Sequence, residues 1–224
     1  MKQIYVTSIL LLLLLPMVQA QNIIFKVGGG WASHSNSDTR NIGAFKLGAS
    51  YELELNGMWG IETGLYYFAK GWKDKDKTVI VYDENGNEVV DDDGNVLMGK
   101  MNVTSNANYI ELPIQVNYYI PLSVGNYLSL SAGPYFAYGI GGKAKTSGDT
   151  ERIGVERLYH EHSTFSQHGM HRFDTGIQTA VSYEWNRRFS VGISADWGLT
   201  KVSTNGAKNI SYILTLAYKL NNSL

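Results

Sequence analysis

The sequence predicts an all-β protein, an eight-stranded antiparallel up-and-down barrel that follows a cleaved signal peptide. Three observations predict it: an apolar N-terminal segment, eight segments with two-residue alternation, and connections that are alternately long and short. The chain of 224 residues has 24 glycines, 15 tyrosines and no cysteine. This composition favours strands and turns, and it excludes disulfides and thiolate metal sites. A formal net charge of -1 gives no sign of a nucleic-acid partner.

The first twenty residues follow the order of a secretory signal peptide. Lys2 precedes an apolar run that reaches Leu15, Pro16 follows, and Val18 to Ala20 form a small-residue cleavage pattern. The run is short for a bilayer span, which disfavours an N-terminal anchor. We therefore expect residues 1–20 to be removed and residues 21–224 to form one barrel domain. No later segment has a helical membrane span, so a mature chain that enters a membrane would do so as a barrel.

Eight later segments alternate between apolar and polar residues, as strands do. In the last one, Ile210, Tyr212 and Leu214 share one face with Leu216, Tyr218 and Leu220, while Asn209, Ser211 and Lys219 lie on the other. The segment before it has a second face that is wholly polar or glycine. The eight predicted strands are 23–31, 46–55, 59–70, 109–120, 127–141, 172–185, 188–200 and 209–220, of which the first is short and glycine-rich.

Alternation alone does not distinguish between two kinds of barrel. A soluble lipocalin-like carrier points its large apolar residues inward around a hydrophobic ligand, whereas a membrane barrel points them toward lipid. The charges on the polar faces are nearly balanced, which suits a narrow lumen in which they pair. They are Lys26, Lys46, Lys70, Arg172, Arg188 and Lys219 against Glu52, Glu54, Glu62, Glu111, Asp174, Glu184 and Asp196.

Aromatic residues concentrate toward the ends of the apolar faces, as membrane interfaces favour. They are Trp31, Trp59, Tyr118, Tyr138, Tyr183, Trp185, Phe189, Trp197 and Tyr218. The loops are asymmetric too: the connections at 55–58, 121–126 and 186–187 are tight, and those at 32–41, 72–108, 142–169 and 201–208 are long. Alternation places all long loops at one end. The sequence therefore predicts a transmembrane β-barrel with short periplasmic turns and long extracellular loops.

Several stretches resemble the small outer-membrane β-barrel proteins of Bacteroidetes, the porin-family or PorT-like group of OmpX/OmpA-type eight-stranded barrels. They are YIELPIQVNYYIP at 109–121, SAGPYFAYGIGGK at 131–143, and the closing pair RFSVGISADWGLTKVS and KNISYILTLAYKL. Proline inside a strand, as at Pro113 and Pro134, is otherwise rare. The resemblance implies a Gram-negative cell outer membrane location, contact with outer-membrane lipid and lipopolysaccharide, and an eight-stranded barrel. It supplies no substrate and no cofactor.

Four of the five histidines lie close together: His160, His162, His168 and His171. On an extended segment His160 and His162 share a face, which is a workable spacing for zinc or copper. The alternative is a polar external loop that contains histidines, and we assign no metal ligands. An outer-membrane lipid-modifying enzyme would need a nucleophile beside a base. Ser163 follows His162, but neighbours in an extended chain point apart, so we predict no catalytic residues.

We expect a non-enzymatic monomer with a plugged lumen, which acts through its external loops in adhesion, recognition or envelope support. Eight strands leave room only for side chains. Tyr66, Phe68, Tyr119 and Tyr135 would add bulk to the lumen, so we expect negligible conductance. We expect an extracellular or envelope protein partner to bind through the loops at 72–108 and 142–169.

The segment DENGNEVVDDDGNVLM at 83–98 contains two copies of an acidic turn within the longest predicted loop. This loop carries four lysines and eight acidic residues. We expect residues 78–82 and 88–90 to pair as a hairpin across Asn85 and Gly86. Asp93 and Gly94 would then turn the chain again and bring Val96 and Leu97 alongside. Neither copy has the ligand spacing of an EF-hand calcium loop.

Overall fold

The computed structural model describes residues 22–35, 37–83, 85–148, 152–153, 156–157, 161–204 and 206–221. The predicted signal peptide, residues 1–20, lies outside them. Among the described residues, no helix has the length and apolar character that a membrane crossing requires.

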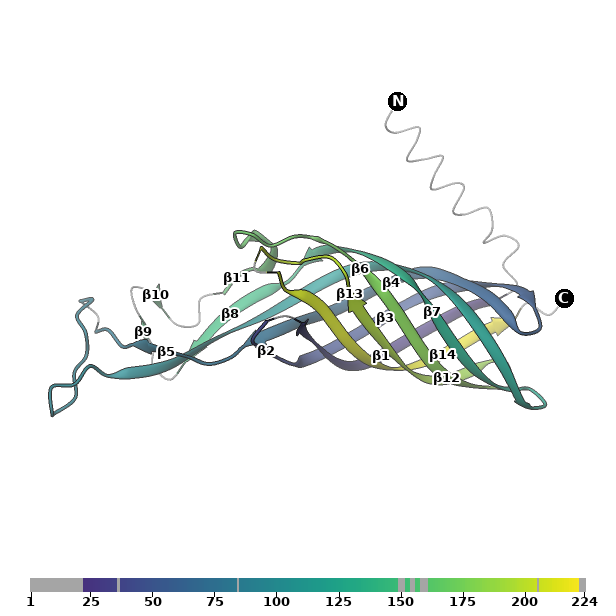
Figure 1. The fold of residues 1–224 in the computed structure, drawn as a ribbon, viewed down its shortest axis with the longest axis horizontal. Helices are drawn as coiled ribbons and strands as arrows, with labels where there is room; N and C mark the ends of the chain where they lie inside the picture. The colour runs from purple at the N-terminus through teal and green to yellow at the C-terminus, as the bar shows by residue number, and fades with distance from the viewer. Residues whose placement is uncertain are drawn as a thin grey trace, which may run out of the picture.

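Eight long strands pair in chain order and close into a ring (Figure 1). They are β1 (Asn22–Ser35), β3 (Ile42–Asn56), β4 (Trp59–Asp74), β6 (Met98–Ser123), β7 (Asn126–Gly141), β12 (Phe173–Trp185), β13 (Phe189–Gly198) and β14 (Lys208–Asn221). All neighbours are antiparallel, and β1 pairs with β14 from Asn22 opposite Asn221 to Ser35 opposite Lys208. The predicted eight-stranded antiparallel up-and-down barrel is thereby confirmed.

The barrel is apolar outside and polar inside. Trp31 and Ile193 on the outer face are 63% and 62% exposed, while Glu111 and Asp174 on the inner face are fully buried. A water-soluble carrier with a hydrophobic interior would show the reverse, so the lipocalin-like alternative is wrong. The outer face suits lipid, because hydrocarbon removes the cost of exposing apolar side chains while charged groups retain partners inside.

Aromatic side chains cluster near the end of the barrel that carries the short turns. Trp59 and Tyr118 have ring centroids 4.7 Å apart. Phe189 lies 5.6 Å from Trp185 and 5.0 Å from Tyr218. Such a girdle is typical of the interface between hydrocarbon and water.

The three short connections have the geometry that tight hairpins require. The turn between β12 and β13 places Asn186 and Arg187 at φ 53° and 48°, the left-handed pair of a type I′ turn. At the β3 to β4 turn, the side-chain oxygen of Asn56 accepts hydrogen bonds from the backbone N–H groups of Met58 and Trp59, both 2.9 Å. The predicted loop asymmetry is confirmed, with all three tight turns at one end.

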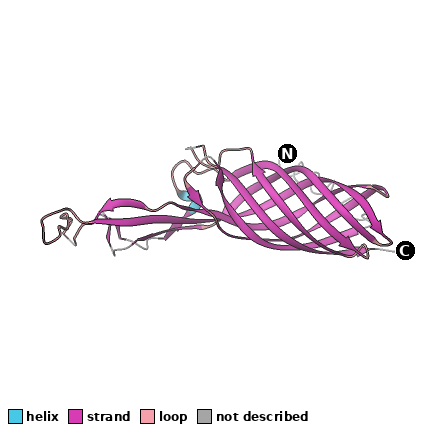
Figure 2. Ribbon diagram, turned by 60° about the horizontal axis from the view of Figure 1, so that its bottom comes forward, coloured by secondary structure: helices cyan, strands magenta, loops and turns pink. Residues whose placement is uncertain are grey.

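At the other end, β4 and β6 continue into a sheet that projects beyond the barrel (Figures 1 and 2). The elements there are β2 (Thr39–Arg40), β5 (Lys77–Ile80), β8 (Lys143–Gly148), β9 (Arg152–Ile153), β10 (Glu156–Arg157), β11 (Glu161–Ser163) and the short helix η2 (Thr164–Ser166). β6 pairs with β5 on one side and β8 on the other, and β11 pairs with β8. Much of the predicted loop at 72–108 is therefore regular sheet.

The predicted hairpin at 78–90 is partly wrong. Tyr82 lies opposite Glu88, and Val90 lies opposite Val96, as expected. However, Thr78 and Val79 pair with Lys100 and Gly99 of β6 rather than with residues 88–90. β6 continues as a strand to Met98, so its backbone N–H and C=O groups can pair with each residue of β5. The short segment 88–90 offers fewer such groups.

Candidate functional site

The lumen is filled by ion pairs between strands that are not neighbours in the barrel. Near the turn end, the Lys219 ammonium lies 2.8 Å from Glu52 and 3.4 Å from Glu184. The hydroxyl of Tyr119 donates to Glu52, and the Asn117 amide donates to the same carboxylate at 2.9 Å. Because these charges are buried, such extra hydrogen bonds are what make the pairing favourable.

A second group of ion pairs occupies the middle of the lumen. Lys26 lies 2.5 Å from Glu62, which also accepts a hydrogen bond from Ser50. Lys46 lies 2.5 Å from Glu111 and 3.6 Å from Asp196. These contacts join strands far apart in sequence and therefore cross-link the barrel from inside.

The outermost group is centred on Asp174. Lys70 lies 2.9 Å from this carboxylate, and the Asn209 amide donates to it at 2.7 Å. The Lys70 ammonium also lies 4.7 Å from the centre of the Tyr109 ring, a cation–π contact. The group is closed to solvent, since Lys70 is only 2% exposed.

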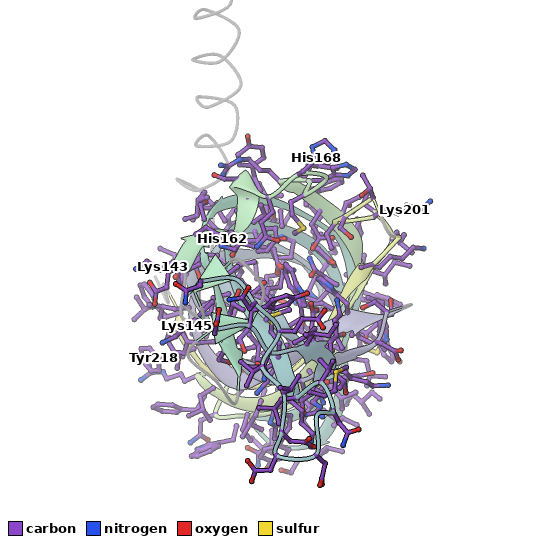
Figure 3. All side chains as sticks on the ribbon, turned by 90° about the vertical axis from the view of Figure 1, so that its left-hand side faces the viewer. Lys143, Lys145, His162, His168, Lys201 and Tyr218 are labelled. Carbon is purple, nitrogen blue, oxygen red and sulfur yellow. The ribbon has the colours of Figure 1, made fainter. Side chains whose placement is uncertain are left out.

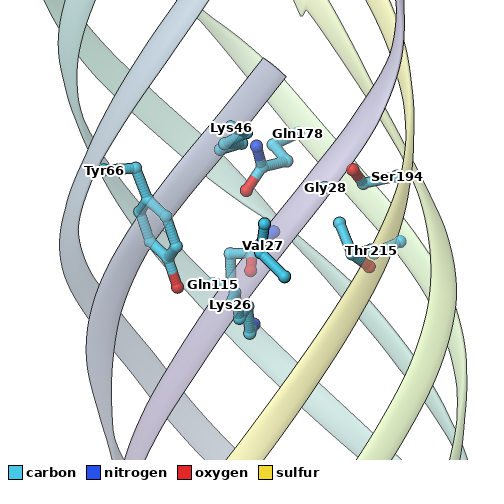
Figure 4. Close-up of a pocket in the computed structure, with 10 residues that line it drawn as sticks. Lys26, Val27, Gly28, Lys46, Tyr66, Gln115, Gln178, Ser194 and Thr215 are labelled. Carbon is cyan, nitrogen blue, oxygen red and sulfur yellow. The ribbon is translucent and has the colours of Figure 1, made fainter.

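Little space remains between these groups. A cavity of about 40 Å³ lies beside Lys26, Lys46 and Gln115, and Figure 4 shows their side chains converging on it. A second cavity of about 30 Å³ lies nearer the turn end, beside Glu62 and Tyr119. The four aromatic residues predicted to add bulk are all buried inside: Tyr66, Phe68, Tyr119 and Tyr135. The lumen is therefore plugged by side chains among the described residues.

Two predicted lumen residues lie elsewhere. Arg172 and Arg188 are exposed at the two ends of the barrel, because each lies just outside a strand. Arg187, which the sequence placed in a turn, contributes instead: its guanidinium lies 3.6 Å from Glu54. Tyr109 is a further buried lumen residue that sequence reasoning did not single out. Its neighbour in the sequence, Ile110, faces outward, and successive strand residues point to opposite faces, so an inward Tyr109 was predictable.

The external mouth is covered by the segment around η2. Phe165 packs edge-on against Tyr109, with centroids 5.6 Å apart, and lies beneath the Arg172 guanidinium. The Thr164 hydroxyl donates to the Asn106 carbonyl at 2.6 Å. Beside this cover, an open cavity of about 570 Å³ is lined by Trp72, His168 and Met170, among others.

The two acidic turns of the projection are structural copies of each other. The Asp83 carboxylate accepts hydrogen bonds from the backbone N–H groups of Asn85 and Asn87, both 2.8 Å. Asp91 accepts those of Asp93 and Asn95 at 3.0 and 2.8 Å. Gly86 and Gly94 have φ of 85° and 80°, a conformation that favours glycine. Each carboxylate accepts hydrogen bonds within its own turn, so its main role is to stabilise that turn.

These backbone contacts affect protonation. The N–H of Asn87 is the main cause that lowers the pKa of the Asp83 carboxyl below 3.8. The N–H of Asn95 does the same for the pKa of Asp91. Both carboxylates therefore remain charged at neutral pH, and the tip of the projection is acidic.

The histidines do not converge where the structure describes them. The His162 ring nitrogen lies 2.8 Å from the Gln167 amide, and a His171 ring nitrogen lies 3.1 Å from the Lys201 carbonyl. Figure 3 shows His162 and His168 on separate segments. No group of three potential metal ligands occurs among the described residues. His160 lies outside the described residues, so the pairing of His160 with His162 stays a hypothesis.

Ser163 and His162 lie on opposite faces of β11. Ser163 is opposite Lys143 in β8, and His162 is opposite Ala144. Since adjacent strand residues point apart, the two side chains do not form a nucleophile and base pair.

A barrel with a lipid-compatible exterior and a plugged polar lumen is an integral membrane barrel. The chain matches the family model described as outer membrane protein beta-barrel domain over residues 18–204. It therefore belongs to this family, and its location is the outer membrane. A comparison with curated proteins finds no match.

The solved structures to which the chain is similar include three small barrels. The attachment invasion locus protein Ail of Yersinia pestis is 14% identical, with a TM-score of 0.43, over 89% of this chain and 99% of that chain. OprG from Pseudomonas aeruginosa is 13% identical, with a TM-score of 0.40, over 90% and 97%. Neisserial surface protein A is 12% identical, with a TM-score of 0.39, over 89% and 96%. These similarities are low, and the family assignment rests on the family match.

Proposed function

We propose that this outer-membrane barrel acts through its external projection, in adhesion, recognition or support of the envelope, and that it catalyses no reaction. The observation that supports the proposal is the contrast between the lumen and the tip of the projection. The charged side chains of the lumen are buried in ion pairs with one another, whereas Asp83 and Asp91 each organise an acidic turn at the end of the projection. A charged tip whose turns are preorganised by hydrogen bonds suits recognition of a partner, because less conformational entropy is lost on binding.

The partner would be an extracellular or envelope protein that contacts the loops at 72–108 and 142–169. A basic surface would complement the tip, whose described acidic residues are Asp83, Glu88, Asp91, Asp92 and Asp93. We further propose that the chain is one of the Bacteroidetes small barrels of the PorT-like group, on the stretches at 109–121 and 131–143. We also propose that residues 1–20 are cleaved during export and that the barrel works as a monomer.

Complementation separates the projection from the barrel. A strain that lacks the protein is supplied either with the full chain or with a chain in which residues 83–97 are replaced by a short glycine-serine turn. Surface adhesion and detergent sensitivity of the envelope are then measured. We expect the shortened chain to reach the outer membrane and to behave like the deletion. Full restoration by the shortened chain would overturn the proposal.

A further inference from the structure

In the part of the chain that the structure describes, the open cavity at the external mouth ends above the plugged lumen. Its volume of about 570 Å³ lies within the usual range of small-molecule sites. One wall comes from the outer ends of β1 and β4 together with β2, and the other from the connections that follow η2 and β13. Beneath Trp72, the next inward residue of β4 is Lys70, whose ion pair with Asp174 closes the lumen. The cavity is therefore a cup that opens outward.

Both walls of this mouth cavity are held by contacts within the chain. The Thr204 N–H donates to the Gly169 carbonyl at 3.0 Å and so joins the two connections. On the other wall, the His34 ring stacks on Trp72 with centroids 4.0 Å apart, and the His34 N–H donates to the Thr39 hydroxyl at 3.3 Å. A cavity that is formed before binding loses less conformational entropy when a ligand enters.

One carboxylate of the lining, that of Asp74, is half-buried and has no direct partner. Asp74 points inward, because it lies two residues beyond the inward-facing Trp72 on β4. Among the described residues, its carboxylate makes no hydrogen bond and no ion pair, and Lys77 acts on it only through longer-range electrostatics. Partial burial without a partner is unfavourable for an anion.

The protonation of Asp74 reflects this environment. The last large apolar residue on the outward face of β4 is Tyr67, so Asp74 lies beyond the membrane-spanning part of the strand. There, burial raises the pKa of the Asp74 carboxyl above its ordinary value, and the charge of Lys77 offsets this only in part. A cation placed beside Asp74 would stabilise its charged form.

The two other carboxylates of the lining already have cations. Asp38 lies 2.7 Å from Lys75, and Asp76 lies 3.2 Å from Arg40. Both pairs are more exposed than the wall around Asp74. The unmet demand for a positive charge is therefore confined to Asp74.

The surface beside Asp74 is apolar on one side. Trp72 belongs to the buried cluster at the mouth, Met170 packs against this cluster, and both residues line the cavity. His34, which is only 7% exposed, lines it too, and its Nε2 atom has no hydrogen-bond partner among the described residues. An anion beside apolar surface suits a ligand that carries a positive charge on a short hydrocarbon chain.

We propose that the mouth cavity binds a small alkylamine, whose ammonium group pairs with Asp74 and whose methylene chain lies against Trp72 and Met170. The ammonium donates charge-assisted hydrogen bonds, which are the strong ones, and burial of the methylenes adds to them. The site goes beyond the proposed function, because it lies at the barrel mouth and does not involve the acidic tip.

The test is an NMR titration of the refolded full barrel with n-butylamine at constant pH and ionic strength. A ligand of this size binds weakly, so the titration extends to roughly 100 mM. Butanol and butyrate are matched probes without the positive charge, and we expect both to bind at least roughly 10-fold more weakly. Methylamine lacks the methylenes and should also bind more weakly. No binding of n-butylamine, or equal binding of butanol, would overturn the proposal.

The variant Asp74→Asn keeps the shape of the side chain and removes its charge. It should bind n-butylamine at least roughly 10-fold more weakly than the parent. The matched control is Asp92→Asn, which removes the same charge from the tip and should bind like the parent. Unchanged binding in Asp74→Asn would contradict the site.

A second variant keeps the test decisive if Asp74→Asn does not fold. Thr204 is exposed and lines the cavity. Thr204→Cys should bind n-butylamine like the parent and lose this binding after reaction with a bulky thiol reagent. The same reaction on Asp92→Cys should leave binding unchanged. Binding that persists in the blocked Thr204→Cys protein would place the amine elsewhere and overturn the proposal.

Two sources supply an alkylammonium group: a free amine, and the lysine side chain of a partner protein. The small, cup-shaped cavity favours the free amine. A glycine-lysine-glycine peptide with blocked ends presents the same butylammonium group on a backbone. It should bind no more tightly than n-butylamine, and tighter binding would overturn the assignment to a free amine.

Replacing residues 83–97 distinguishes this proposal from the proposed function. The shortened chain should bind n-butylamine as the parent does, even though it fails in complementation. Asp74→Asn should show the converse, with weak amine binding and full complementation. Loss of amine binding in the shortened chain would assign the site to the tip and contradict the mouth cavity.

Discussion

Phe165 occupies the space that the missing side chain of Gly139 leaves on the inner wall of β7. A Cβ atom at Gly139 would lie 2.2 Å from the Phe165 ring. The absence of a side chain at Gly139 therefore lets the connection that carries Phe165 pack into the barrel mouth.

Gly139→Ala should displace Phe165 and destabilise the barrel by about 1–3 kcal/mol, because overpacking forces the ring or the backbone to move. The measurement is the unfolding temperature, together with protease sensitivity of the connection. Gly141→Ala is the control, since a Cβ there meets nothing within 4 Å. Equal effects of the two substitutions would contradict the packing of Phe165 against Gly139.

Lys70→Met should destabilise the barrel by about 3–5 kcal/mol, because Asp174 then stays buried without its cation. Lys75→Met, which removes an exposed pair with Asp38, should lower stability far less. Heat-modified migration in gels reads out both. The double variant Lys70→Met, Asp174→Asn should recover part of the loss; no recovery would argue against the pair.

The purified barrel should show negligible steady conductance in planar bilayers. In the described part of the chain, the ion pairs and the buried rings of Phe68, Tyr109 and Tyr135 leave small cavities, of about 40, 30 and 10 Å³. Large, stable channels would contradict a plugged lumen.

The acidic turns should loosen in acid. The pKa values of Asp83 and Asp91 are lowered in the folded turns, so their stabilisation is present above the ordinary value of 3.8 and is lost as pH falls through the lowered values. The protection of the Asn87 and Asn95 amides, measured as their exchange rates relative to the intrinsic rates at the same pH, should fall between neutral pH and about pH 2. In Asp83→Asn, the first turn should lose this pH dependence while the second keeps it.

Orientation can be tested with single cysteines, because the chain has none of its own. An impermeant thiol reagent on intact cells should label Asp92→Cys at the tip and leave Val124→Cys unlabelled. Val124 is fully exposed in a short turn at the other end. After cell lysis both should react; labelling of Val124→Cys on intact cells would reverse the orientation.

Much of the fold could be predicted from two-residue alternation. Each of the eight predicted segments lies on one of the eight ring strands, and the inward faces carry the predicted bulky residues such as Phe68 and Tyr135. Alternation works here because every strand separates lipid from a polar lumen, so each residue faces one environment or the other.

The external elements were harder to predict. The extension of β6 back to Met98, with β5 and β8 on its two sides, crosses sequence in which neither face carries a run of large apolar residues. The two-residue periodicity is therefore weak there, and pairing depends on the backbone groups of the neighbouring strands. The cover at the mouth was missed for a similar reason, because a single Phe in a polar loop carries no pattern.

The sequence by itself determined the strand count, which residues face lipid, and the asymmetry of the loops, since these follow from local order along the chain. Only the tertiary structure decided which cation meets which carboxylate, and that Phe165 fits against Gly139. Those relationships depend on the register between strands distant in sequence, which is set when the sheet closes into a barrel.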